Sequence, residues 1–308
     1  MVSETRKTLF VGDNPFHGIS HLSADRARDR GDEIRNAEYA AQLVMTSLEN
    51  GANGFMFSVS ETTLSVLLLL SKKLKNRDLL LYAIVPYAYE YVRLATKFGT
   101  IGLGGKLITR VILSRNLRAL VTGLKGIITL DPTSLLKAYL HYEISRIKSS
   151  IGQRQSLSSI LLHEVVTDML LALDCERIFK SYISFISNLK MKPGFVTRNF
   201  AYLVNKFKKW NIDFNRIVIV SSFNEVGFQM DPSKTVCEKA LMEIPEANVI
   251  AMSILAAGYL QFSKAIDYIE SLSNLNGVVV GVSKEKHASE TFGLLRERFS
   301  EKAKSDLF

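Results

Sequence analysis

Short runs of apolar residues recur along the chain at intervals that suit strands separated by helices. Most of these runs are continuous rather than alternating, which is typical of parallel strands buried on both faces. Eight runs predict strands: 8–13, 54–59, 79–86, 159–164, 194–199, 216–222, 248–254 and 277–283. Between the strands, apolar residues three and four positions apart predict amphipathic helices, as at 36–51, 134–150 and 262–274.

Eight strands that alternate with helices predict an α/β fold, a single (β/α)8 TIM-type barrel over residues 1–308. The 308 residues suit such a barrel, and no linker rich in Pro or Gly divides them. A further apolar run, GIITL at 126–130, is a spare strand candidate. The alternative is an open, doubly wound sheet, but its Gly-x-Gly-x-x-Gly pattern does not follow the first predicted strand.

The composition is that of a globular protein with a substantial core, since 47% of the residues are hydrophobic and 22% are charged. No apolar run reaches the roughly 18 residues needed to span a bilayer, and the first residues lack the apolar core of a secretory signal. The two cysteines, Cys175 and Cys237, form no paired motif. We therefore expect a reduced, cytoplasmic protein without a disulfide framework or a structural zinc site.

The formal net charge of +9 comes largely from one region. Between Glu90 and Asp131 there is no acidic residue. The same stretch contains seven basic residues: Arg93, Lys97, Lys106, Arg110, Arg115, Arg118 and Lys125. This basic helical or loop excursion at about 93–131 is either a solvated helix face or a segment that meets an anionic ligand or surface. We expect no nucleic-acid binding, because aromatic residues do not interleave with the bases, and no membrane insertion.

Polar residues gather directly after the first predicted strand, in the sequence GDNPFHGISH. Active sites of (β/α)8 barrels lie at the carboxyl ends of the strands, so Asp13 and His17 are candidate catalytic residues, with Asp13 as a general base or a group that orients the ligand. The alternative is that Asp13 or Asn14 caps the turn and that His17 is either solvated or hydrogen-bonded within the core. We expect neither to contribute much to the core. His21 is a weaker candidate, and no metal is expected, because a spacing of four within a loop is not a ligand motif.

Four elements in the second half of the chain resemble the aldo/keto reductase superfamily. SILLHEV is similar to the fourth strand of that family, which ends in a histidine, here His163. GFVTRNF resembles the fifth strand, with Arg198 and Asn199 in the places of its Ser-Asn pair. NVIAMSILAAGYL looks like the seventh strand and its loop, and GVVVGVSKEKH looks like the eighth strand and the start of the last helix. The resemblance covers a little over half of the chain.

This resemblance implies an oxidoreductase-like barrel enzyme that binds NADP, and no metal, at its last loops, with His163 as the third catalytic residue. The cofactor contacts that it implies are Asn199, Ser253, Gly258, Gly281, Ser283, Lys284 and Lys286. Ser283 is a credible N-cap of the last helix. Lysines in the first turn of a helix oppose its dipole unless an anion binds there, so their presence favours a phosphate ligand.

The first half of the chain departs from the reductase pattern. The family places Asp and Tyr after strand two and Lys after strand three, whereas this chain reads NGFMFSVSETT and IVPYAYE. Without that Tyr and Lys, the usual proton donor for carbonyl reduction is missing, and Asp13 and His17 would replace it. Two other functions stay open. One is a cofactor-independent lyase, isomerase or hydrolase acting on a phosphorylated or carboxylated small molecule, and the other is a non-catalytic barrel.

Overall fold

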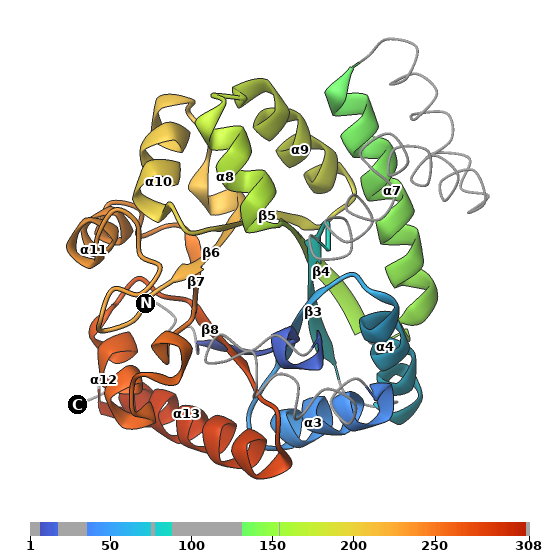
Figure 1. The fold of residues 1–308 in the computed structure, drawn as a ribbon, viewed down its shortest axis with the longest axis vertical. Helices are drawn as coiled ribbons and strands as arrows, with labels where there is room; N and C mark the ends of the chain where they lie inside the picture. The colour runs from blue at the N-terminus through green and yellow to red at the C-terminus, as the bar shows by residue number, and fades with distance from the viewer. Residues whose placement is uncertain (1–6, 18–35, 75–77, 88–130, 154, 306–308) are drawn as a thin grey trace.

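The computed structural model describes residues 7–17, 36–74, 78–87, 131–153 and 155–305. Eight parallel strands pair in chain order and close into a barrel, around which the helices form a ring (Figure 1). The strands are β1 (Thr8–Gly12), β2 (Gly54–Ser58), β3 (Leu79–Val85), β4 (Gln155–Leu162), β5 (Lys192–Thr197), β6 (Val218–Ser222), β7 (Asn248–Met252) and β8 (Gly277–Gly281). All eight predicted strands are confirmed, and the predicted (β/α)8 architecture with them.

The first and last strands pair along their whole length, from Thr8 opposite Gly277 to Gly12 opposite Gly281. This pairing excludes the open sheet, in which the strands at the two edges would each lack a neighbour. The spare strand candidate at 126–130 lies outside the described residues. So does the basic excursion, apart from its last residue, Asp131.

Nine α-helices lie in the described residues, and five of them begin at a side chain that caps the helix. The nine helices are α3 (Ala37–Glu49), α4 (Glu61–Lys73), α7 (Pro132–Ser150), α8 (Glu164–Ala172), α9 (Glu176–Asn188), α10 (Phe200–Lys209), α11 (Lys234–Met242), α12 (Phe262–Ser271) and α13 (Glu285–Ser305). Asn36 caps α3, Ser60 and Thr63 form a capping box at α4, and Asp131 caps α7. Each of these side chains accepts hydrogen bonds from backbone N–H groups that a helix start leaves unpaired. Three short 3-10 turns complete the description: η1 (Asn14–His17), η2 (Phe214–Arg216) and η3 (Ala256–Gly258).

Alternate residues of the strands point into the barrel and pack as a core of their own. This inner core contains Phe10, Met56, Tyr82, Leu161, Val196, Val218, Val220 and Ile250. Burial raises the pKa of the Tyr82 hydroxyl, although a hydrogen bond to Asn248 partly opposes the rise. Gly54 makes room for Phe10, because a Cβ at position 54 would overlap the Phe10 ring. The barrel is therefore filled with side chains below its mouth, as in other barrels of this size.

The outward-facing residues of the strands pack against the helices in a larger core. Its densest aromatic group joins α9, β5 and α10. The Phe207 ring centroid lies 5.2 Å from that of Phe179 and 5.1 Å from that of Phe195, and Trp210 lies 5.5 Å from Phe179. Aromatic rings at such distances add to the free energy already gained by burial.

In the part of the chain that the structure describes, no helix combines the length and the apolar character needed to cross a bilayer.

We predict that Phe207→Ala lowers the free energy of unfolding by about 3–5 kcal/mol, because it leaves a cavity inside a fully packed aromatic group. Tyr202→Ala on the same helix is the matched control. Tyr202 is exposed, so its loss should cost less than about 1 kcal/mol. Guanidinium chloride unfolding followed by circular dichroism measures both, and equal losses would show that the aromatic group is not a stabilising core.

Candidate functional site

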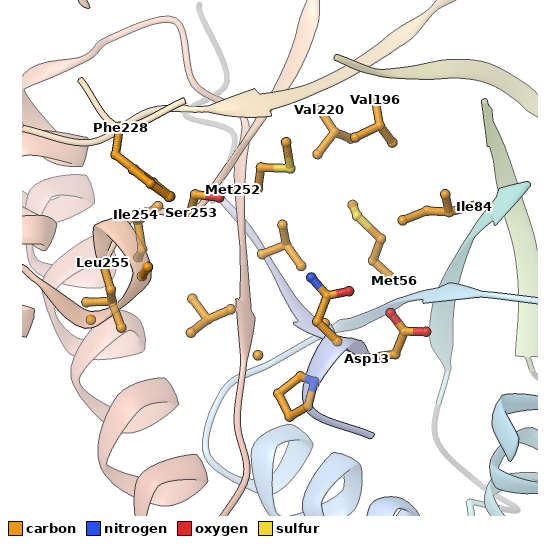
Figure 2. Close-up of a pocket in the computed structure, with 18 residues that line it drawn as sticks. Asp13, Met56, Ile84, Val196, Val220, Phe228, Met252, Ser253, Ile254 and Leu255 are labelled. Carbon is orange, nitrogen blue, oxygen red and sulfur yellow. The ribbon is translucent and has the colours of Figure 1, made fainter. Parts of the chain in front are cut away.

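A cavity of about 270 Å³ opens at the carboxyl ends of the strands. Its walls come from most of the strand ends and from the loops after β1, β6 and β7. Figure 2 shows Met56, Ile84, Val196, Val220 and Met252 around it, with Asp13 at one side. Most of the side chains that line the cavity are apolar, and Asp13 is the charged residue among them. The cavity is therefore suited to a small ligand with an apolar body and at least one polar group.

Asp13 is the first residue after β1, and its side chain is buried at 3% exposure. Its Oδ2 atom accepts two hydrogen bonds, from the backbone N–H of Ser58 at 2.7 Å and from Nε2 of His17 at 2.8 Å. Oδ1 has no hydrogen-bond partner among the described residues. One oxygen of the carboxylate is thus fixed by two donors, while the other is left for a ligand.

His17 lies one turn beyond Asp13, at the end of η1. The turn is closed by a hydrogen bond from Phe16 N–H to the Asp13 carbonyl at 2.8 Å, which brings the two side chains together. The His17 side chain is 5% exposed, and its ring lies 4.8 Å from the Tyr87 ring with an interplanar angle of 36°. His17 is not among the residues that line the cavity. Its hydrogen bond holds the Asp13 carboxylate in place.

Tyr87 is a site residue that the sequence analysis missed. It follows β3 by two positions, so it stands at the same edge of the barrel as Asp13. A signal was available: the residue lies at the carboxyl end of a predicted strand, where barrel chemistry gathers.

The expectation that Asp13 contributes little to the fold needs correction. Removing its carboxylate would leave the Ser58 N–H without its acceptor and His17 without its partner, both in buried surroundings. A buried polar group that loses its partner costs about 1–3 kcal/mol. Alanine at position 13 is therefore a poor test of function, and asparagine, which keeps a side-chain carbonyl, is a better one.

His163 stands across the mouth, between β4 and α8. It caps α8, and its Nδ1 atom accepts the Val165 N–H at 3.2 Å. Burial lowers the pKa of His163 below the ordinary 6.5, and the charge of Arg198 adds to this effect, whereas Glu164 and Asp13 oppose it. The charge of Asp13 thus acts on His163, but His163 is not among the residues that line the cavity.

The end of β5 is tied to α8 by a group of polar contacts. Asp168 accepts the hydroxyl of Thr197 at 2.5 Å and the N–H of Arg198 at 3.2 Å. Burial raises the pKa of the Asp168 carboxyl, although these hydrogen bonds and one from the Asn199 side chain oppose the rise. Asn199 therefore faces Asp168, and it does not line the cavity as its predicted cofactor role would require.

The loop after β7 approaches the cavity with an unusual backbone. Ser253, Ala256 and Ala257 have φ angles of 54°, 45° and 59°, and Gly258 has a φ of 85°. Non-glycine residues rarely adopt this left-handed region, and such strain is often stored at functional sites. Ser253 and Gly258, both predicted cofactor contacts, line the cavity, as does the predicted Gly281.

The three remaining predicted cofactor residues lie away from the cavity. Helix α13 begins at Glu285, so the residue directly before it is Lys284, not Ser283 as the sequence analysis expected. Lys284 and Lys286 are exposed, and Lys286 lies 3.7 Å from Glu290 one turn along the helix. The structure thus brings Asp13 and His17 together, places three of the seven predicted cofactor residues on the cavity and leaves four of them off it.

Within the described ranges, no group of three or more His, Cys, Asp and Glu side chains is arranged to hold a metal ion.

The comparisons with known proteins show a likeness in fold but not in sequence. No protein-family model matches the sequence, and no curated protein matches it significantly. Among solved structures, two described as putative aldo-keto reductases from Pseudomonas aeruginosa align with 97% of this chain and 100% of their own. Their TM-scores are 0.56 and 0.54, each at 9% sequence identity. The chain is thus a (β/α)8 barrel protein with a fold like that of aldo-keto reductases. This confirms the resemblance at the level of the fold.

We predict that the lowered pKa of His163 makes stability depend on pH. The unfolded chain takes up a proton near pH 6.5 that the folded protein accepts only at lower pH, so the free energy of unfolding should fall as the pH drops below about 6.5. His163→Asn keeps a good capping residue but does not titrate, so it should flatten this dependence. Urea unfolding between pH 5.5 and 7.5 measures the slope.

The exposed His287 offers a control for that measurement. His287→Asn should leave the dependence on pH as it is in the wild type. If His163→Asn also leaves the slope unchanged, another group causes the dependence.

Proposed function

We propose that this protein is an enzyme that performs acid–base chemistry on a small molecule at the mouth of the barrel, with Asp13 as the general base. One observation carries the proposal: a buried carboxylate borders an apolar cavity, with one oxygen fixed by two donors and the other without a partner among the described residues. A solvated turn residue would not need this arrangement. A purely structural role accounts for the two hydrogen bonds to Oδ2, but not for the placement of Oδ1 beside the cavity.

The chemistry follows from the two oxygens. Oδ2 is fixed by Ser58 N–H and His17, so the carboxylate cannot rotate away from the cavity. Oδ1 takes a proton from the ligand and returns it at a neighbouring atom. The apolar walls exclude water, which strengthens electrostatic interactions between the carboxylate and the ligand. A positioned base of this kind contributes about 10²–10⁴-fold to a rate.

The ligand that we propose is a small phosphorylated molecule. The loop 253–258 would hold its phosphate, since a strained, left-handed backbone beside the cavity can present N–H groups to an anion. The volume of about 270 Å³ lies at the lower end of the range for small-molecule pockets. This size favours a substrate smaller than a dinucleotide.

NADP is the alternative ligand for the same loop, and the described residues fit only one end of it. Ser253, Gly258 and Gly281 lie where a phosphate would be held. At the end of NADP where the nicotinamide ring would react, however, His163 caps a helix through Nδ1, and the side chain of Asn199 lies against Asp168. These contacts favour the cofactor-independent function, and we derive no hydride-transfer step.

We predict that the protein exchanges carbon-bound hydrogen next to the carbonyl group of small phosphorylated aldehydes or ketones. Incubation in D₂O followed by ¹H NMR detects such exchange with no need to identify the physiological product. Asp13→Asn should slow the exchange at least 100-fold, because the amide keeps the Ser58 hydrogen bond but cannot act as a base.

Asp174→Asn is the matched control for this substitution. Asp174 is an exposed acid beyond the end of α8, where it pairs with Lys206, and its loss should leave the exchange rate unchanged. Exchange that persists in Asp13→Asn would remove Asp13 from the chemistry. No exchange with any compound of the panel would count against proton transfer at carbon.

A titration with NADPH distinguishes between the two ligands considered for the loop 253–258, a small phosphorylated molecule and NADP. We expect no saturable change in protein or cofactor fluorescence up to millimolar concentration, because the contacts at the reactive end are already used within the protein. Saturable binding that competes with a phosphorylated substrate would restore the reductase interpretation.

A further inference from the structure

Arg198 follows directly after β5, at the carboxyl edge of the barrel. Side chains alternate along a strand, and Val196 points into the barrel, where it lines the cavity. Thr197 points the other way and bonds Asp168 of α8. Arg198 lies beyond the end of β5, and its guanidinium meets Glu164 at the start of α8. Arg198 is not among the residues that line the cavity, but its side chain is 39% exposed at the same edge of the barrel, where a ligand that extends from the cavity can reach its guanidinium.

Few of the N–H groups of the Arg198 guanidinium donate hydrogen bonds within the described part of the chain. Nη2 donates to Oε1 of Glu164 at 2.5 Å. Nε is buried and has no partner within the described part of the chain. An arginine has five N–H donors in a fixed fork, and a buried donor left unpaired costs about 1–3 kcal/mol. Glu164 therefore satisfies one side of the fork only.

A second buried polar atom without a partner lies on the neighbouring strand. Ser222 ends β6 and follows Val218 and Val220 on the inward-facing row. It is 0% exposed, and its hydroxyl has no hydrogen-bond partner among the described residues. The register pairs Thr197 with Ser221, so the next residues along, Arg198 and Ser222, are neighbours. Unpaired buried polar atoms are rare in folded proteins. Two of them side by side mark a place where the hydrogen bonding is incomplete.

We propose that Arg198 binds a carboxylate group of the substrate, and that Glu164 occupies the guanidinium only while no substrate is present. A carboxylate that approaches the fork from the side accepts from Nε and Nη2 together, whereas Glu164 accepts from Nη2 alone. The substrate thus supplies the acceptor that Nε lacks. The inference rests on the proposed function in one respect: the ligand is the one whose body occupies the cavity that Asp13 borders, and its carboxylate extends beyond the lining residues to Arg198.

The arginine fork selects for a carboxylate by its shape. Two parallel N–H groups match the two coplanar oxygens of a carboxylate, and such bidentate pairs are the stronger charge-assisted hydrogen bonds. A neutral amide offers one acceptor oxygen, and its NH₂ group would face the guanidinium with its own donors. A phosphate also has oxygens at a suitable spacing, so the experiment includes a phosphate probe.

The test is the binding of three probes that share one apolar ring, measured by calorimetry: benzoate, benzamide and phenyl phosphate. We expect the wild type to bind benzoate at least tenfold more tightly than benzamide, whereas phenyl phosphate has a second anchor in the loop 253–258 and serves to compare the variants. Arg198→Ala should weaken benzoate binding at least tenfold, because it removes both donors. Glu164→Gln should tighten it, because it removes the negative charge that competes for the guanidinium.

Arg177→Ala is the matched control. Arg177 pairs with Asp131 at 3.2 Å and is well exposed, so benzoate should bind this variant as it binds the wild type. If Arg198→Ala does not fold, Arg198→Lys gives the result instead, since a lysine keeps the charge but lacks the fork and should also weaken binding.

Each opposite outcome overturns the proposal. Benzoate that binds Arg198→Ala as tightly as the wild type, or that does not bind the wild type, removes Arg198 from ligand binding. Weaker binding by Glu164→Gln shows that the ion pair is structural. Phenyl phosphate that loses as much affinity as benzoate in Arg198→Ala shows that Arg198 binds anions in general, and contradicts the selection for a carboxylate. Benzoate binding reports on Arg198 and deuterium exchange reports on Asp13, so the two proposals fail separately.

Discussion

The pairing of β1 with β8 is the constraint on which the candidate site depends. Five consecutive residue pairs join the first and last strands, although they lie at opposite ends of the described chain. This closure sets the loop after β1, which carries Asp13, beside the loops after β7 and β8. In an open sheet those loops would lie at opposite edges, and no common cavity would form. The backbone hydrogen bonds between two strands thus bring the loops of the mouth together. The side chains on those loops then determine which groups a ligand meets there.

The mouth itself combines an apolar floor with a polar rim whose parts are held by hydrogen bonds. Asp13 connects β1 to the end of β2 through Ser58. Asp168 connects α8 to the end of β5, and His163 fixes the start of α8. These contacts hold strand ends that would otherwise be free to move, so the charged groups keep fixed positions around the cavity. A rim of this kind has little need to reorganise when a ligand enters, which is the main physical requirement for electrostatic catalysis.

The sequence alone predicts the parts of this structure that depend on local periodicity. Continuous apolar runs located all eight strands, and Asp13 and His17 were found because they follow the first of them. The contacts that define the rest of the rim join residues far apart in the chain: Glu164 and Arg198 are 34 positions apart, and Ser222 belongs to another strand. Only the register of the closed sheet brings them together. The predicted roles of Lys284 and Lys286 were wrong for the opposite reason: their charge suggested a ligand site, but both are exposed at the start of α13 and neither lines the cavity.

The likeness to aldo-keto reductases in fold, without their Tyr and Lys, has a physical explanation. The stability of a barrel resides in its strands, in the packed interior and in the helices around it, none of which needs a particular residue at the mouth. Side chains at the strand ends are therefore free to differ as long as each buried polar group has a partner. In this chain the charged side chains of the rim, Asp13, Glu164 and Arg198, follow β1, β4 and β5. Arg198 Nε and Ser222 Oγ are the exceptions in this rim, because both are buried without a partner among the described residues, and the proposed carboxylate would supply an acceptor for Nε.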